Sequence, residues 1–191
     1  MKDRSARSTR SAHLLRLVVS ALFLAIAFVL PFLTGQIQQI GNMLCPMHLP
    51  VMLCGFVCGW PWGLAVGIIA PIMRSLILGM PPMMSAIPMA VELAVYGACT
   101  GLLYKLLPKK IPFIYVNLLC SMVAGRVVWG LFSAAFAGVR GVEFGMEIFF
   151  TQAVVNAIPG IILQIILVPV LVMALRRGRL MLNEPALPAD H

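Results

Sequence analysis

Residues 48–67 read HLPVMLCGFVCGWPWGLAVG, and this stretch decides what kind of protein the chain forms. Two apolar runs meet at Trp60-Pro61-Trp62, where a proline between glycines at 59 and 63 predicts a short turn. Glycine recurs every fourth residue, at positions 55, 59, 63 and 67. Such spacing lets helix backbones approach closely inside a membrane. We therefore expect two apolar helices that pack against each other in lipid.

The composition of the whole chain supports the same environment. Of the 191 residues, 61% are hydrophobic and only 10% are charged, and the mean hydropathy is +1.01. A soluble domain averages about 45–50% apolar and about 25% charged residues. The composition thus excludes a soluble cytosolic domain, a secreted disulfide scaffold and a disordered chain.

Six apolar runs follow one another, and most approach the roughly 20 residues that one membrane span requires. They cover residues 14–34, 48–60, 62–79, 84–107, 112–138 and 149–175. Barrel strands would be about 10 residues long with strict alternation. We predict an all-α integral membrane protein with six transmembrane helices in one membrane domain, 1–191. A basic tail (1–13) precedes the bundle (14–175), and a second tail (176–191) follows it.

The charge distribution predicts the orientation of the bundle. There are 14 Lys and Arg residues against 6 Asp and Glu, a net charge of +8. Eleven cations flank the spans on the side of the two termini: Lys2, Arg4, Arg7, Arg10, Arg16, Lys105, Lys109, Lys110, Arg176, Arg177 and Arg179. By the positive-inside rule both termini are cytoplasmic. A nucleic-acid-binding arm at residues 1–16 is the alternative, but no aromatic residues are interleaved there, and we expect no nucleic-acid partner.

Several polar residues lie inside or beside the apolar runs, where an ionisable group suggests a function. With a rise of about 1.5 Å per residue, they converge on the outer half of the bilayer. This predicts a pocket open to the outside, with the candidates His48, Arg74, Glu92, Arg126, Gln152 and Asn156. Two arginines against one glutamate leave a surplus positive charge, which favours a carboxylate or phosphate on the ligand. The alternative is that Glu92 pairs with Arg126 or Arg74 merely to join helices.

A pair of small residues and a membrane-embedded amide also carry structural expectations. Ala21 and Ala25 lie one turn apart on the first helix, a pattern that serves either packing within the chain or docking of a separate protein. Asn117, near the inner end of the fifth span, is expected to be structural.

The sequence offers no chemistry for catalysis or for a cofactor. The five cysteines are odd in number and mostly lie in apolar runs, so we expect neither a disulfide nor a metal site. A phosphate-binding loop, a Gly-x-Ser nucleophile beside a histidine, and a cluster of aspartates are all missing. We predict that the protein is not an enzyme and carries no cofactor.

In order and spacing, these features resemble the substrate-binding (S) components of energy-coupling factor (ECF) vitamin transporters. The resemblance covers nearly the whole chain: a basic N-terminus, six spans and a long first outer loop. Its local motifs are Ala21-x-x-x-Ala25, the quoted stretch 48–67, and residues 92–101, ELAVYGACTG.

The resemblance implies a function, partners and a site. An S component captures a micronutrient, typically a B vitamin, from outside and associates with a membrane coupling subunit and two cytoplasmic ATPases. It then topples to deliver the substrate inward. The location implied is the plasma membrane of a bacterium, and pantothenate and riboflavin are both candidate ligands. In the family the small-residue motif of the first helix meets the coupling subunit, a role carried here onto Ala21 and Ala25. The family site nominates Gln38, Asn42, His48, Glu92, Arg126, Gln152 and Asn156.

The rival interpretation is a self-sufficient secondary transporter or channel for a small anionic solute. It requires a pocket that opens to both sides without a partner. The inner halves of the apolar runs offer no polar lining for such a path.

Overall fold

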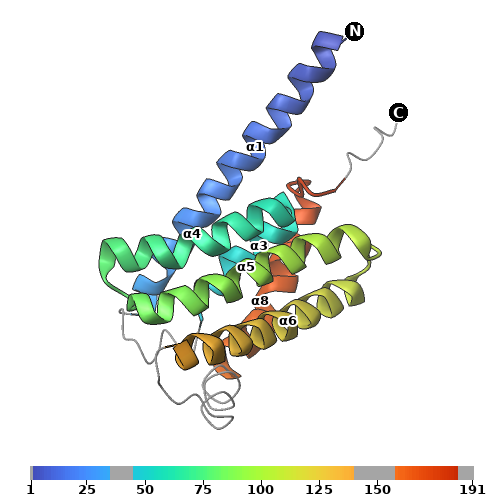
Figure 1. Ribbon diagram of the computed structural model, residues 1–191. Coiled ribbons are helices and arrows are strands. Elements are labelled where there is room, and N and C mark those ends of the chain that lie inside the picture. The colour runs from blue at the N-terminus through green and yellow to red at the C-terminus, as the bar shows by residue number, and fades with distance from the viewer. Residues whose placement is uncertain (1, 35–44, 140–157, 185–191) are drawn as a thin grey trace.

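The computed structural model describes residues 2–34, 45–139 and 158–184, and this part of the chain is helical (Figure 1). The elements are α1 (Lys2–Val29), the 3-10 helix η1 (Leu30–Thr34), α3 (His48–Cys58), α4 (Trp60–Leu78), α5 (Met83–Leu106), α6 (Ile111–Val139) and α8 (Ile158–Arg177). Five of the described helices are long and apolar enough to cross a membrane, and α3 is a shorter apolar helix. The expected all-α membrane architecture is confirmed.

The start of α1, the end of α8 and the turn between α5 and α6 lie at one end of the bundle (Figure 1). We call this the termini end, and the opposite end, with the α4–α5 turn, the far end. The helix of α1 begins at Lys2, so the segment expected as a basic tail continues the first span as helix. The start expected for the last span, at 149, lies outside the described residues.

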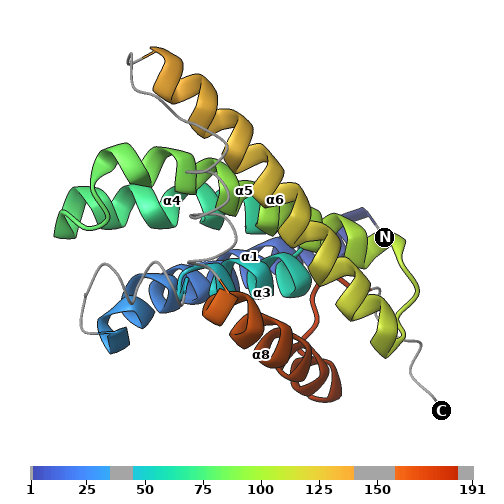
Figure 2. The same ribbon diagram turned by 90° about the horizontal axis from the view of Figure 1, so that it is seen from below.

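The helix α3 is too short to cross the bilayer by itself. Its 11 residues extend about 16 Å, roughly half of the hydrocarbon core. All of its side chains except Leu49 are buried, because α1, α4, α5 and α8 all pack against it (Figure 2). It ends at Cys58 because Gly59 adopts a left-handed φ of 99°, which turns the chain into α4.

The glycines of the quoted stretch bring α4 and α5 into backbone contact, as their spacing predicted. A Cβ on Gly63 would overlap the backbone of Gly97, and a Cβ on Gly97 would overlap Gly63 in return. Gly55 of α3 faces the same part of α5, beside Thr100. At these glycines α3 and α4 therefore approach the backbone of α5 closely.

Hydrogen bonds join α5 to α6 within this core. The Asn117 side-chain amide donates to the Thr100 carbonyl at 2.9 Å, and the Ser121 hydroxyl donates to Oδ1 of Asn117 at 3.1 Å. Both Asn117 and Ser121 are fully buried. The structural role expected for Asn117 is confirmed.

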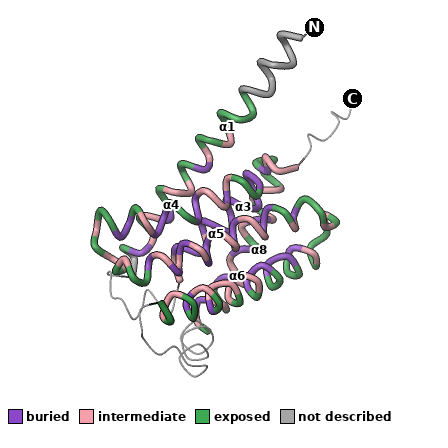
Figure 3. The backbone as a smooth tube through the Cα atoms, in the orientation of Figure 1, coloured by how far each residue is buried: buried purple, intermediate pink, exposed green. Residues whose placement is uncertain are grey.

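The helix α1 is the least enclosed of the long helices. It packs against α3 and α4, and within the described ranges it makes no helix-to-helix contact with α5, α6 or α8. Its first half extends beyond the bundle at the termini end, and exposed positions lie along much of its described length (Figures 1 and 3). Leu14, Val18 and Leu22 are each more than half exposed.

Candidate functional site

Three helices contribute charged or ionisable side chains to one cluster around Glu92. Glu92 lies in the middle of α5 and is 3% exposed. The Arg126 Nη1 of α6 is 3.0 Å from Glu92 Oε1, and the His48 Nε2 of α3 is 3.7 Å from the same oxygen. We call these three residues the Glu92 cluster. The packing of α3, α5 and α6 thus brings together residues that are up to 78 positions apart in the sequence.

The cluster contains buried polar atoms whose hydrogen-bonding capacity is unused within the described part of the chain. Both ring nitrogens of His48 and Nε of Arg126 make no well-aligned hydrogen bond there. Oε1 of Glu92 accepts none either, although it forms the ion pair with Arg126. Leaving such a group without a partner costs about 1–3 kcal/mol, and more when it is charged. A small polar molecule that hydrogen-bonds to these atoms would recover that free energy.

Two further residues border the cluster. The Tyr96 ring, one turn along α5 from Glu92, lies 5.3 Å from the His48 ring at an interplanar angle of 59°. The Cys45 sulfur is 3.9 Å from Nη2 of Arg126, and Cys45 holds a left-handed φ of 46°. Such a backbone conformation is unfavourable for a residue with a Cβ, and it is held here by the bond from the His48 backbone N–H to the Cys45 carbonyl.

Burial raises the pKa of the Cys45 thiol to about 11. The nearby Glu92 carboxylate raises this pKa further, while the Arg126 guanidinium opposes the increase. At neutral pH the thiol is therefore protonated and uncharged, so Cys45 adds a weak donor to the site and no negative charge.

The structure adds Cys45, Tyr96 and Gly125 to the residues that the sequence nominates for the site. A Cβ on Gly125 would overlap the ring of Tyr96, so Gly125 makes room for that ring beside Arg126. A tyrosine in an apolar run is usually a packing residue, and the feature that distinguishes Cys45 is its positive φ, which is invisible in a sequence.

Arg74 stands apart from the Glu92 cluster. It is 3% exposed, and its Nη1 donates to the Phe28 carbonyl at 2.6 Å. Its guanidinium carbon lies 5.2 Å from the centre of the Phe32 ring. Among the described residues Arg74 makes no ion pair with Glu92, so of the two pairings left open by the sequence, the structure has Arg126–Glu92. Arg74 instead joins α4 to the end of α1, where the α-helix gives way to the 3-10 helix η1 and the Phe28 carbonyl accepts its hydrogen bond.

Four of the nominated residues lie outside the described residues: Gln38, Asn42, Gln152 and Asn156. Of the nominated substrate-site residues, the structure brings together His48, Glu92 and Arg126. Arg74, in α4, is instead hydrogen-bonded to the Phe28 carbonyl of α1.

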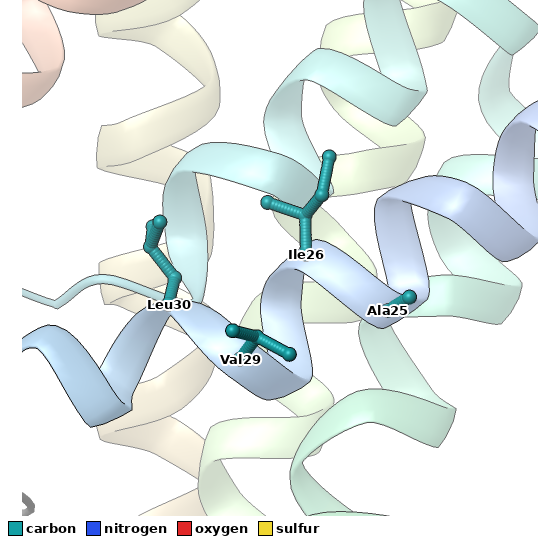
Figure 4. A pocket seen from close by; sticks show the side chains of 4 residues that line it. All are labelled: Ala25, Ile26, Val29 and Leu30. Atoms are coloured by element: carbon teal, nitrogen blue, oxygen red, sulfur yellow. The ribbon is translucent and has the colours of Figure 1, made fainter.

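The small-residue pair of α1 lies on its exposed side. Ala21 and Ala25 are both exposed, and an open hollow of about 290 Å³ is lined by Ala25, Ile26, Val29 and Leu30 (Figure 4). All four lining side chains are apolar. This face is separate from the Glu92 cluster and suits packing against another apolar helix better than binding a polar solute.

Comparison with known protein families identifies a matching family. The family model described as "ECF transporter, substrate-specific component" matches residues 15–172, which include the Glu92 cluster and both alanines of α1. Searches of the curated proteins and of the solved structures return no match.

Proposed function

Because the chain belongs to the family of ECF transporter substrate-specific components, we propose that it captures a micronutrient of the B-vitamin class at the Glu92 cluster. It is a multi-pass membrane protein and a transport subunit. In this proposal it sits in a bacterial plasma membrane with its termini in the cytoplasm, and the far end of the bundle faces outside.

The single observation that carries the proposal is the meeting of His48, Glu92 and Arg126. Each comes from a different helix, each lies within the apolar bundle, and Glu92 Oε1 is within 4 Å of both partners. An ion pair that only joined α5 to α6 would not need His48, whose ring is 2% exposed and has both nitrogens unsatisfied among the described groups. Buried polar groups without partners mark a place where a ligand completes the hydrogen bonding.

The charge balance of the described residues favours a ligand without a large net negative charge. Glu92 neutralises Arg126, and the second arginine, Arg74, is held on the Phe28 carbonyl. The surplus cation that the sequence placed in the pocket is thus engaged elsewhere. Of the two candidate vitamins, a neutral ring system such as riboflavin fits this balance better than the acid pantothenate, so riboflavin is the first ligand to test.

Delivery of the ligand requires partners in this proposal. The sequence has no Gly-x-x-x-x-Gly-Lys-Ser/Thr phosphate-binding loop, so ATP hydrolysis is assigned to two cytoplasmic ATPases. A membrane coupling subunit joins them to the chain through the exposed α1 face with Ala21 and Ala25. Shape supports this assignment, since small side chains let a second helix approach closely.

Reconstitution tests the proposal. The purified protein in liposomes should bind riboflavin or a related vitamin and transport none of it. Addition of the coupling subunit and the ATPases should start uptake that requires ATP, and an ATPase variant without its catalytic carboxylate is the matched control. Steady uptake by the lone protein would instead establish the self-sufficient carrier.

A further inference from the structure

The chain beyond α8 folds back over the termini end of the bundle. At the end of α8 the Leu180 backbone N–H donates to the Leu175 carbonyl at 3.0 Å, and Arg179 takes a left-handed φ of 55°. This is the hydrogen-bond pattern of a Schellman helix end, which reverses the direction of the chain. Residues 178–184, which we call the strap, were expected to form part of a cytoplasmic tail, but Met181 is only 7% exposed and belongs to the hydrophobic core.

Side chains and carbonyls of the strap bind to several helices at once. The Asn183 side-chain amide donates to the Gly101 carbonyl of α5 at 3.1 Å, and the Tyr104 hydroxyl donates to Oε1 of Glu184 at 2.5 Å. Glu184 also pairs with Nε of Arg176 at 3.4 Å. The strap is therefore fixed to α5 and α8.

One bond connects the strap to α1. The Arg16 Nη2 donates to the Leu182 carbonyl at 2.7 Å across 166 positions of sequence. Because α1 contacts only α3 and α4 among the described long helices, this bond is its direct link to the side of the bundle formed by α5 and α8.

We infer that the strap is a positioning element, which holds the termini end of α1 at a fixed inclination and thereby presents the face of Ala21 and Ala25 to the coupling subunit. That use of α1 rests on the proposed function, whereas the inclination itself is a property of the chain alone. Without the strap, the contacts with α3 and α4 alone would restrain α1 within the described part of the chain, and movement of its exposed first half would strain those contacts.

The test measures the distance between α1 and α5 directly. Spin labels on unnatural amino acids at the exposed positions His13 and Lys105 leave the five cysteines in place, and the distance distribution is recorded in nanodiscs. Asn183→Ala combined with Glu184→Ala removes the polar side-chain bonds of the strap to α5 and α8. Arg177→Ala is the matched control, since Arg177 is exposed at the end of α8. We expect the double variant to broaden or shift the distribution and the control to leave it unchanged.

The same samples are used to measure assembly and ligand binding. We expect the double variant to associate with the coupling subunit about tenfold more weakly, the equivalent of one or two hydrogen bonds lost from the docking geometry, with ligand affinity retained. An unchanged distance distribution, or a shifted one with unchanged assembly, overturns the inference. Wild-type protein that binds no vitamin would refute the proposed function and leave the distance result standing.

A milder variant covers the case in which the double variant does not fold. Arg16→Met removes the side-chain donor of the bond between α1 and the strap, and Arg16→Lys restores a donor at that position. We expect Arg16→Met to broaden the distribution and Arg16→Lys to narrow it again. Equal distributions for methionine and lysine would overturn the inference.

Discussion

The ring of Tyr96 fills the space that a Cβ at position 125 would occupy, so only glycine fits there without displacing the ring. That ring in turn packs on His48, so a change at Gly125 reaches the Glu92 cluster through one intermediate residue. The geometry of the site therefore depends on a residue that makes no polar contact itself.

We predict that Gly125→Ala lowers both stability and ligand affinity, because the methyl group displaces the Tyr96 ring. Overpacking of this kind costs about 1–3 kcal/mol, which thermal unfolding in detergent measures. Gly138→Ala is the control on the same helix, since nothing lies within 4 Å of its added Cβ. Equal unfolding temperatures and affinities for the two variants would contradict the role of Gly125.

Cys45 provides a pH-dependent probe of the same site. With its pKa raised to about 11, the fraction of reactive thiolate grows about tenfold per pH unit throughout the range from 7 to 10. In a variant that retains only this cysteine, we expect the rate of maleimide modification to rise across that whole range. A rate that levels off between pH 9 and 10 would show a thiol with its ordinary pKa and contradict its burial.

At the scale of the helix, Arg74 joins α4 to the end of α1. We predict that Arg74→Met reduces stability by about 1.5–3 kcal/mol, the usual contribution of a hydrogen bond from a charged donor, because the Phe28 carbonyl loses that donor. Ligand affinity, measured by titration calorimetry, should fall far less than it does in Arg126→Ala. Equal losses of affinity in the two variants would place Arg74 in the substrate site after all.

The exposed face of α1 gives a second prediction at this scale. Ala21→Leu together with Ala25→Leu should leave ligand binding unchanged and reduce ATP-driven uptake, because larger side chains keep a partner helix at a distance. Val127→Leu with Val170→Leu is the control, since both valines are about half exposed on other helices. Normal assembly of the alanine variant with the coupling subunit would exclude this face as the docking surface.

Helix positions in the middle of the chain were largely predictable from the sequence, because the apolar runs there are bounded by Gly, Pro or Lys residues. The expected runs 62–79, 84–107 and 112–138 correspond to α4, α5 and α6 within one or two residues at each end. Run length could not show that α3 is enclosed on all sides, since burial depends on which helices surround it. The strap was also unpredictable, because its bonds are to carbonyls of distant helices and carry no local sequence signal.

For the whole molecule, the depth of polar residues in the spans placed Glu92, Arg126 and Arg74 in the same half of the bilayer, but depth alone could not choose between Arg126 and Arg74 as the partner of Glu92. The rise per residue gives the depth of a side chain in the membrane. It does not give the orientation of the helix about its own axis, which decides the neighbouring helix that the side chain faces. The resulting molecule has a polar cluster within its apolar bundle and an exposed apolar helix, α1, along its side. These two features match the two tasks of the proposed function: holding a solute and docking to a partner.

Native mass spectrometry of the detergent-solubilised protein shows whether the Glu92 cluster holds the ligand, since it weighs whatever small molecule each variant retains. Wild type and the control Arg177→Ala should each carry one vitamin-sized ligand. Arg126→Ala, and the uncharged pair Glu92→Gln with Arg126→Gln, should be folded and empty. Retention of the same ligand by folded Arg126→Ala would contradict a substrate site at the Glu92 cluster.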